Sequence, residues 1–353
     1  MEQYLISEFL IIGGGVAGLA TAQQLLLQGK AVTLLERAAV GQESSWAGGG
    51  ILAPLCPWDY ADEVTRLTSL GAAMFPQWAT GMHAATGIDP EYAVSGMLVL
   101  PPFDGSLAQR WCAEHDFRME QRADSILLPD VAQVRNPRLV QALSNHIALL
   151  GGRIVEHCEV QRVETRGQRV QGLVTSCGEF SAERYVVSAG AWSKQVLGRH
   201  ALQLDIKPMR GQMLLFKFDA PPLQHIVLQD GMYLIPRRDG HLLVGSTLED
   251  VGFDKSTTSE ARDSLRQHAQ LLLPALRGMP LVQHWAGLRP ASPRNIPTIG
   301  QHPQLDNMYI NSGHFRYGVT MAPASAAILM NELNGVDQPF DVSPYRSGWG
   351  VAA

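Results

Sequence analysis

The sequence predicts an α/β fold (α+β overall), in which a Rossmann-like nucleotide-binding domain carries a second domain built on an antiparallel sheet. Three observations predict it. An apolar run, a glycine-rich turn and a helical pattern open the chain, which is typical of a βαβ unit. Short strand-like runs separated by turns occupy residues 206–247. A second glycine-bounded turn precedes an apolar, alanine-rich run near the C-terminus.

The opening unit has the clearest pattern. Phe9–Ile12 is a buried-strand run that stops at glycines, and a helical pattern follows over Val16–Gln28. Gly29 closes that helix, and Ala31–Leu35 is a second apolar strand. Strands joined through a helix run parallel, so this unit predicts a parallel sheet.

Later elements follow the same two periodicities. The segments up to residue 188 are helices at Glu63–Gly81 and Arg138–Leu150, paired strands at Arg153–Val163 and Gln168–Val174, and a short strand at Arg184–Ser188. The later segments are antiparallel strands at Gln212–Phe218, Met232–Pro236 and Leu242–Gly245, a helix at Ser259–Leu273, and a final helix after Pro323.

This order predicts two discontinuous domains. The nucleotide-binding domain takes residues 1–80, 140–205 and 286–353, and the substrate-binding or cap domain takes residues 81–139 and 206–285. A length of 353 residues is enough for two substantial cores.

Composition excludes several classes of protein. Hydrophobic residues are 46% and charged residues 17%, the balance of a compact globular enzyme, and a net charge of −5 without a basic block argues against nucleic acid as a partner. The four cysteines show neither CxxC spacing nor a nearby histidine cluster, so reduced thiols and no metal site are expected. Without a signal peptide or a membrane-length apolar run, a cytoplasmic protein without a membrane span is expected.

The first glycine turn predicts a dinucleotide site. Gly13, Gly15 and Gly18 form G-x-G-x-x-G between a strand and a helix, where bare backbone and the helix N-terminus accept a pyrophosphate. Glu36 ends the next strand, 18 residues after Gly18. A carboxylate there accepts hydrogen bonds from ribose hydroxyls and repels a 2′-phosphate, which favours FAD or NAD over NADP.

Two further loops favour FAD. Ser44–Pro54 is rich in hydroxyls and glycine, which suits phosphate and a flat ring lying against main chain. Near the C-terminus, Gly313 and Gly318 bound a turn that opens a helix and carries Arg316, a second place for an anion. Two such loops at opposite ends of the chain predict one large cofactor held at two points.

With these loops in order, the chain resembles the D-amino-acid oxidase superfamily of flavoproteins, and within it the glycine oxidases of the thiamine-pathway type. The resemblance covers nearly the whole chain. The motifs that carry it are Gly13–Gly18 with Glu36, Ser44–Pro54, Val187–Trp192, Pro208–Gln212, Trp285–Pro290 and Gly313–Pro323.

The resemblance implies cofactor contacts along the chain. Those expected at the AMP half, the pyrophosphate and the flavin ring are Val16, Ala17, Glu36, Arg37, Ser44, Ser45, Gly49, Gly50, Ile51 and, for the adenine, Val160. Those expected around the pyrimidine side of the flavin are His314, Phe315, Arg316, Tyr317, Gly318, Val319 and Thr320. In the related monomeric sarcosine oxidases the flavin is attached to a cysteine that follows the region matched by Arg289. No cysteine follows Cys177 in this chain, so the resemblance implies that FAD is bound non-covalently.

The resemblance also implies a substrate site and a reaction. Arg289, Arg316 and Tyr233 match the residues that bind the substrate carboxylate. The reaction implied is hydride transfer from the α-carbon to flavin N5, reoxidation by O2 to H2O2, and hydrolysis of the imine to an oxo acid, glyoxylate for glycine, and ammonia. No general base is required. Alternatively, the imine passes to synthesis of the thiazole of thiamine.

Three questions stay open at this point. Gly231 and Leu248 stand where some glycine oxidases have histidine and methionine, so sarcosine, N-ethylglycine, D-Ala, D-Pro or other small D-amino acids are further candidate substrates. A D-amino-acid dehydrogenase that uses a quinone and a flavoprotein that binds FAD without turnover are the competing functions. Assembly into a homo-oligomer is also left open.

Overall fold

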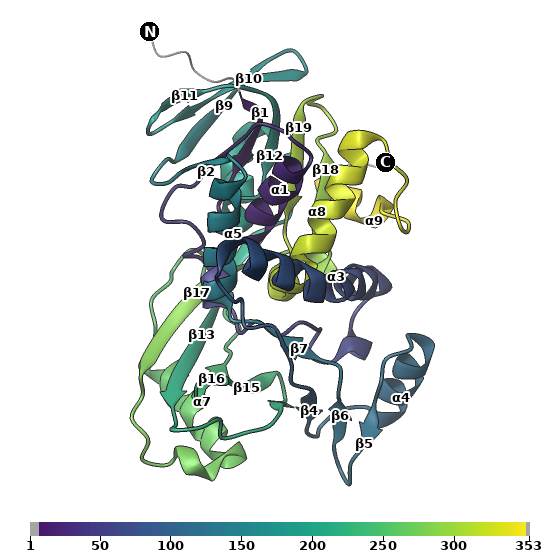
Figure 1. The fold of residues 1–353 in the computed structure, drawn as a ribbon, viewed down its shortest axis with the longest axis vertical. Helices are drawn as coiled ribbons and strands as arrows, with labels where there is room; N and C mark the ends of the chain where they lie inside the picture. The colour runs from purple at the N-terminus through teal and green to yellow at the C-terminus, as the bar shows by residue number, and fades with distance from the viewer. Residues whose placement is uncertain (1–6, 351–353) are drawn as a thin grey trace.

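The computed structural model describes residues 7–350 and has two parts that lie end to end (Figure 1). One part is built on a six-stranded sheet with the order β18-β19-β12-β1-β2-β8. All neighbours in it are parallel except β18 and β19. The strands are β1 Ser7–Ile12, β2 Val32–Leu35, β8 Arg153–Val155, β12 Ala182–Val187, β18 Thr298–Gln301 and β19 Met308–Ser312.

Four helices pack together on one face of this sheet. Their apolar residues form a single buried cluster with the strand side chains that point to this face. They are α1 Val16–Leu27, α3 Asp62–Thr86, α5 Asn136–Leu149 and α8 Gly318–Asn334. The opposite face is covered by a three-stranded sheet and α6 Ser193–Leu197. Its strands are β9 Val160–Arg166, β10 Arg169–Thr175 and β11 Gly178–Phe180. The parallel sheet is therefore buried on both sides.

The other part is an eight-stranded sheet with the order β17-β13-β16-β15-β14-β4-β6-β5, antiparallel except where β14 meets β4. Its strands are β4 Met97–Val99, β5 Glu120–Gln121, β6 Ile126–Leu128, β13 Lys207–Lys217, β14 Ile226–Gln229, β15 Met232–Pro236, β16 His241–Gly245 and β17 Gln283–Ala291. Helix α7, Ser259–Leu272, packs Leu265 and Ala269 against one face of it.

The remaining elements are short or peripheral. They are α2 Ser44–Ala47, α4 Gly105–Glu114, α9 Ser343–Arg346, and the small ladder of β3 Ala93–Val94 with β7 Ala132–Gln133. Among residues 7–350, the structure has no helix that is both long and apolar enough to cross a membrane.

The predicted α/β class and the opening βαβ unit are confirmed, and two predicted elements are wrong. Arg153–Val163 is not one strand: β8 and β9 lie in different sheets, because the chain turns at His157, with φ of 55°, and Cys158 N–H bonds back to the carbonyl of Glu36. The last helix begins at Gly318, and Pro323 lies inside it. Proline there omits one hydrogen bond near the helix start without ending the helix.

The two-domain division stays a prediction, and three of its four internal limits fall inside regular elements. The 80/81 limit cuts α3 and the 285/286 limit cuts β17, a strand that pairs with β13 along its length. Within residues 81–139, β4 and β6 belong to the eight-stranded sheet, while α5 packs in the helical layer of the other part.

Candidate active site

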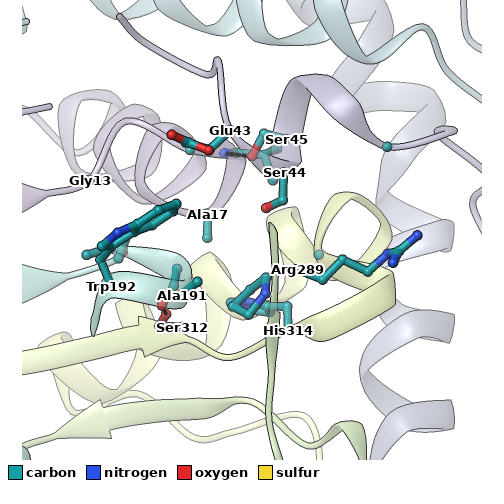
Figure 2. A pocket seen from close by; sticks show the side chains of 18 of the residues that line it. Gly13, Ala17, Glu43, Ser44, Ser45, Ala191, Trp192, Arg289, Ser312 and His314 are labelled. Atoms are coloured by element: carbon teal, nitrogen blue, oxygen red, sulfur yellow. Dashed lines mark hydrogen bonds between the residues drawn. The ribbon is translucent and has the colours of Figure 1, made fainter. Parts of the chain in front are cut away.

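A cavity of about 580 Å³ lies where the two parts meet. Parallel strands deliver one wall: β1, β2, β12 and β19 all end at it, with Ile12, Leu35, Ser188 and Ser312 among the lining residues. The eight-stranded sheet supplies the other wall. In Figure 2, Ala17, Ser44 and Ser45 lie on one side of this space, and Ser312 and His314 lie on the other. Ligands of open parallel sheets bind outside these carboxyl ends of the strands.

The start of α1 presents backbone N–H groups to the cavity. Gly15 caps this helix without a side-chain hydrogen bond, and Val16 N–H donates to Ser45 Oγ at 2.8 Å. The preceding turn requires glycine at Gly13, which has φ of +110° and whose Cβ would lie 2.4 Å from the carbonyl oxygen of Ser188. The helix dipole and the unbonded N–H groups of the first turn make this a site for phosphate.

Glu36 fixes the loop from the end of β2. Its Oε2 accepts the Gly14 N–H at 2.7 Å, and its Oε1 accepts the Ala38 N–H at 3.0 Å. Each carboxylate oxygen has two lone pairs, so capacity is left for hydroxyl donors of a ligand. Glu36 lines the cavity, as a ribose-binding residue must.

The structure brings most of the predicted site residues to this cavity. Those that line it are Gly13, Gly15, Val16, Ala17, Glu36, Arg37, Ser44, Ser45, Gly49, Gly50, Ile51, Val160, Tyr233, Arg289, His314, Phe315, Arg316, Tyr317, Gly318 and Val319. Gly18 and Thr320 lie behind the lining. A Cβ at Gly18 would sit 2.0 Å from the Gly13 carbonyl oxygen, and Thr320 Oγ1 donates to the carbonyl of Ile51 at 3.2 Å.

Several lining residues were not predicted from the sequence. The guanidinium of Arg37 lies 3.6 Å from the centre of the Trp192 ring and pairs with Glu43 at 2.8 Å, and all three line the cavity. Trp192 stands in one of the motifs that carry the family resemblance, so a signal existed. Its direction depends on the 3-10 turn after β12, which a sequence pattern does not specify.

Beside the eight-stranded sheet the cavity holds a cation without a counter-ion. Arg289, on β17, is partly buried and lines the cavity, and among residues 7–350 no carboxylate pairs with it. Its Nη1 donates to the carbonyl of Thr247 at 3.1 Å, and its Nη2 donates to Ser246 Oγ at 2.6 Å. Desolvation by the surrounding protein lowers the pKa of Arg289. A partly buried cation without a counter-ion favours an anionic ligand.

Arg289 lies against the backbone of the neighbouring strand. A Cβ at Gly211 on β13 would be 2.1 Å from Arg289 Nη1, so only glycine leaves room for the guanidinium there. Tyr233, on β15, is buried beside this site with its hydroxyl 3.9 Å from Met213 Sδ. Arg316 also lines the cavity, and within residues 7–350 it makes no hydrogen bond or ion pair.

Gly231 and Leu248, by contrast, do not line the cavity. Leu248 is 45% exposed, and the space around Gly231 is open. These two positions therefore do not widen the pocket in this structure, and Ser246, which was not predicted, lines it instead.

Unpaired buried polar atoms in the lining call for a ligand. They are Ser188 Oγ, Asn311 Oδ1, His314 Nε2, Asn136 Oδ1 and Tyr317 OH. Buried polar atoms in native proteins nearly always have partners. FAD carries donors and acceptors along its whole length, so the residues present fit this cofactor. His314 is fully buried, and burial lowers its pKa to about 4, which keeps the ring neutral at pH 7.

A buried arginine, Arg237, holds the backbone of the Gly48–Gly50 segment. Arg237, at the end of the β15–β16 hairpin, donates from Nη2 to the carbonyl of Gly49 at 2.8 Å. Its Nη1 donates to Gln133 Oε1 at 2.6 Å and to the carbonyl of Val134 at 2.9 Å. Burial lowers the pKa of Arg237 to about 10, so it stays charged at neutral pH.

Comparisons with known proteins agree with this geometry. A family model described as DAO, FAD dependent oxidoreductase, matches residues 8–332. The chain is 41% identical to glycine oxidase of Pseudomonas aeruginosa, over 95% of this chain and 97% of that one. It is 33% identical to the bifunctional protein ThiO/ThiG of a Synechocystis species, over 92% of this chain and 51% of that one.

Solved structures place the fold in the same group. The crystal structure of glycine oxidase from Bacillus cereus superposes with a TM-score of 0.86 at 25% identity, covering 94% of this chain and 96% of that one. The family model spans most of the chain, and the Pseudomonas relative is matched nearly end to end. The chain therefore belongs to the DAO family of FAD dependent oxidoreductases.

Proposed function

We propose that this protein is an FAD-dependent oxidase of glycine and small amines, including sarcosine, D-Ala and D-Pro. It releases the oxo acid, glyoxylate in the case of glycine, with ammonia and H2O2. The observation that carries this proposal is the partly buried guanidinium of Arg289, which lacks a carboxylate partner among the described residues and lines a cavity suited to a dinucleotide. The names of the Pseudomonas and Bacillus relatives support the choice of glycine.

The cofactor would be held by residues from the beginning and from the end of the sequence. The α1 N-terminus with Ser45 suits the pyrophosphate, Glu36 the ribose, and residues 314–319 the flavin. When bound, FAD supplies the hydride acceptor and the route by which electrons reach O2. Non-covalent binding is part of the proposal, since the one cysteine in the cavity lining is Cys158, next to the segment proposed for the adenine.

The protein's own residues bind and orient the amino acid. Arg289 and Arg316 would bind the carboxylate, and Tyr233 would donate its hydroxyl to it. Within the described residues Arg316 makes no hydrogen bond or ion pair, and its guanidinium lies 5.7 Å from the centre of the Phe315 ring, so its donors are available to a ligand. Partial burial of the Arg289 guanidinium reduces its contact with water and so strengthens its attraction for a carboxylate.

The proposed reaction takes no proton onto a side-chain base. His314 is the histidine of the cavity lining, and a pKa of about 4 makes it a weak base. The substrate amine must then arrive neutral, and orientation above the cofactor provides the main protein contribution to the rate.

An oxygen-dependent assay tests the proposal. The FAD-loaded protein is mixed with glycine, sarcosine, D-Ala, D-Pro and D-Asp in air, and H2O2 and oxo acid are measured together. Equimolar H2O2 and glyoxylate from glycine are expected. Fast dye or quinone reduction without H2O2 would indicate a dehydrogenase instead. Failure of glycine to bleach the flavin under anaerobic conditions would indicate a flavoprotein without turnover.

Three further points belong to this proposal. The glycine imine would serve synthesis of the thiazole of thiamine, and the similarity to the ThiO/ThiG protein supports this step. We also propose a cytoplasmic location and assembly into a homo-oligomer. Co-purification with a thiazole synthase and light-scattering mass in solution are the measurements that check the first and the last.

A further inference from the structure

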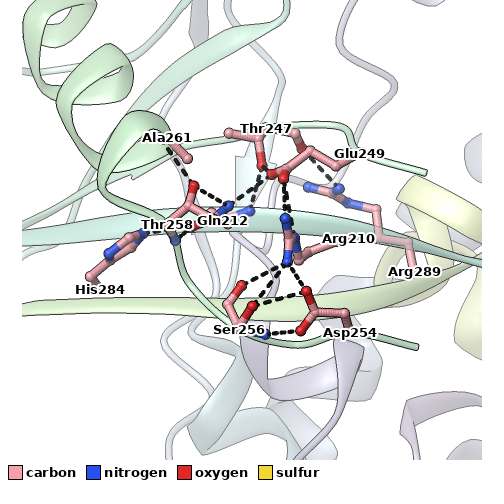
Figure 3. A network of polar contacts seen from close by, with 10 residues as sticks. All are labelled: Arg210, Gln212, Thr247, Glu249, Asp254, Ser256, Thr258, Ala261, His284 and Arg289. Atoms are coloured by element: carbon pink, nitrogen blue, oxygen red, sulfur yellow. Dashed lines mark hydrogen bonds and ion pairs between the residues drawn. The ribbon is translucent and has the colours of Figure 1, made fainter. Parts of the chain in front are cut away.

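The orientation of Arg289 depends on the segment that follows β16. Both hydrogen bonds made by its guanidinium end on this segment, at the Ser246 hydroxyl and the Thr247 carbonyl. Figure 3 shows that Arg289 lies at one edge of a polar network that continues through Thr247 to Glu249 and Arg210. The direction of the guanidinium is therefore set by whatever holds Thr247 in place.

Thr247 is held by Glu249 and Gln212. The Thr247 hydroxyl donates to Glu249 Oε1 and accepts the backbone N–H of Gln212 at 2.9 Å. The side-chain amide of Gln212 also donates to Glu249 Oε1, at 2.9 Å. Gln212 is fully buried on β13, so this end of the network is anchored in the sheet.

Glu249 is in turn fixed by a buried arginine. Its Oε2 accepts from Arg210 Nε at 3.1 Å and from Nη2 at 2.5 Å, a two-pronged pairing whose guanidinium side chain is 5% exposed. Burial by itself would raise the pKa of Glu249, but hydrogen bonds from Thr247, Arg210 and Gln212 outweigh it and lower the pKa. Glu249 is therefore a fixed anion at neutral pH.

The same arginine reaches a second carboxylate that does not touch Thr247. Arg210 Nη1 pairs with Asp254 Oδ2 at 2.8 Å, and the Asp254 side chain is 52% exposed. Glu249 and Asp254 thus share a partner and a charge. The difference that matters here is that only Glu249 is hydrogen-bonded to Thr247, whose carbonyl accepts from Arg289.

We propose that Glu249, locked by Arg210, is a positioning residue for substrate binding: through Thr247 it aims the Arg289 guanidinium at the substrate carboxylate. It touches neither substrate nor cofactor, so its effect passes entirely through Arg289. The inference rests on the proposed role of Arg289 as the carboxylate-binding residue. Displacing a binding group by about 1 Å can cost on the order of 100-fold in rate, so a loosened Arg289 should be measurable.

The test compares Glu249→Gln with Asp254→Asn in the FAD-loaded protein. Glu249→Gln keeps the size of the side chain but replaces one acceptor oxygen with a donor, which conflicts either with Gln212 and Thr247 or with Arg210. We expect KM for glycine to rise about 10-fold or more while kcat stays within about 3-fold. The dissociation constant of acetate, a carboxylate without the amine, followed by the flavin spectrum, should rise by the same factor. Asp254→Asn should leave both within about 3-fold.

A second pair of variants guards against general loss of structure. Thr247→Val removes the hydroxyl that joins Thr247 to Glu249 while the Arg210 pair remains, and it should raise KM and the acetate constant as Glu249→Gln does. Thr247→Ser keeps the hydroxyl and should restore values near those of the parent protein. Lower thermal stability with unchanged KM and acetate affinity in Glu249→Gln would overturn the inference.

Arg289→Lys separates failure of this inference from failure of the proposed function. Unchanged acetate affinity in Arg289→Lys would mean that Arg289 does not bind the carboxylate, and the proposed function would lose its basis. Weakened affinity in Arg289→Lys with no effect of Glu249→Gln would overturn the positioning role alone. In the double variant, the two losses should be less than additive, because both act through one guanidinium.

Discussion

Partial burial of a guanidinium without a carboxylate partner costs desolvation free energy. In Arg289 two hydrogen bonds, to Ser246 and Thr247, offset part of that cost. Three of the five N–H donors of the side chain remain for other partners. At the scale of the single residue, this is a group kept ready for a ligand, and Gly211 provides the space in which it lies.

Arg289→Ala should raise KM for glycine about 100-fold with FAD still bound, because about two charge-assisted hydrogen bonds to the carboxylate are lost. Steady-state kinetics and the flavin-to-protein absorbance ratio check both halves of this expectation. Unchanged kinetics would show that Arg289 does not bind the substrate. Loss of FAD would show that Arg289 contributes to cofactor binding instead.

His314 should make stability depend on pH. Burial lowers its folded-state pKa from 6.5 to about 4. Between these pH values His314 is protonated in the unfolded chain but neutral in the folded protein. The free energy of unfolding therefore falls as pH drops from about 6.5 toward 4, by up to about 3 kcal/mol from this residue. Urea unfolding of the parent protein and of His314→Gln at pH 7.5 and 4.5 measures it. The variant should lose less stability at the lower pH, and equal losses would contradict the assignment.

At the scale of elements, the cavity is made where helix starts meet strand ends. The two loops that deliver it are local, and their glycines, serines and Glu36 could be found from spacing alone. Trp192, Asn311 and Ser246 could not, because each faces the cavity as a result of a turn or a strand end set by distant packing. The break after β8 was missed for a similar reason: no glycine or proline stands between Arg153 and Val163 to mark it, and a contact with Glu36 turns the chain away.

Glu36→Ala should weaken FAD retention without changing the order of preferred substrates. Two backbone N–H groups, of Gly14 and Ala38, lose their acceptor, and ribose hydroxyls lose theirs. Dialysis followed by flavin fluorescence measures the retained fraction, and the peroxide assay with added FAD measures substrate order. Glu156→Ala is a control, because Glu156 accepts the Val40 N–H nearby but does not line the cavity. A selective loss of glycine activity in Glu36→Ala would contradict the cofactor role.

At the scale of the whole molecule, one of the buried groups that join the two parts is Arg237. Arg237 joins the β15–β16 hairpin to the glycine turn at Gly49 and to the segment before α5. A sequence pattern gave no reason to select it over its neighbour Arg238, since both follow the same strand. The same holds for the eight-stranded sheet: β4 has three residues, and its pairing with β14 joins positions more than a hundred residues apart.

Arg237→Met should lower the free energy of unfolding by about 2 kcal/mol or more, because three buried acceptors lose their donor. Arg238→Met is the matched control: its side chain is 63% exposed and its ion pairs are at the surface, so a change below about 1 kcal/mol is expected. Chemical denaturation of both variants measures the difference. Equal effects would show that burial of Arg237 contributes nothing beyond a surface charge.

The cavity draws its walls from residue 12 at one end and residue 319 at the other. During synthesis the first loop leaves the ribosome long before the second exists, so the growing chain holds only one of the two grips on its cofactor. With both loops holding FAD as proposed, we expect firm capture of FAD only after nearly the whole protein has been made and β19 has joined the sheet beside β12. A chain truncated before the last helix would keep its opening βαβ unit and still emerge colourless.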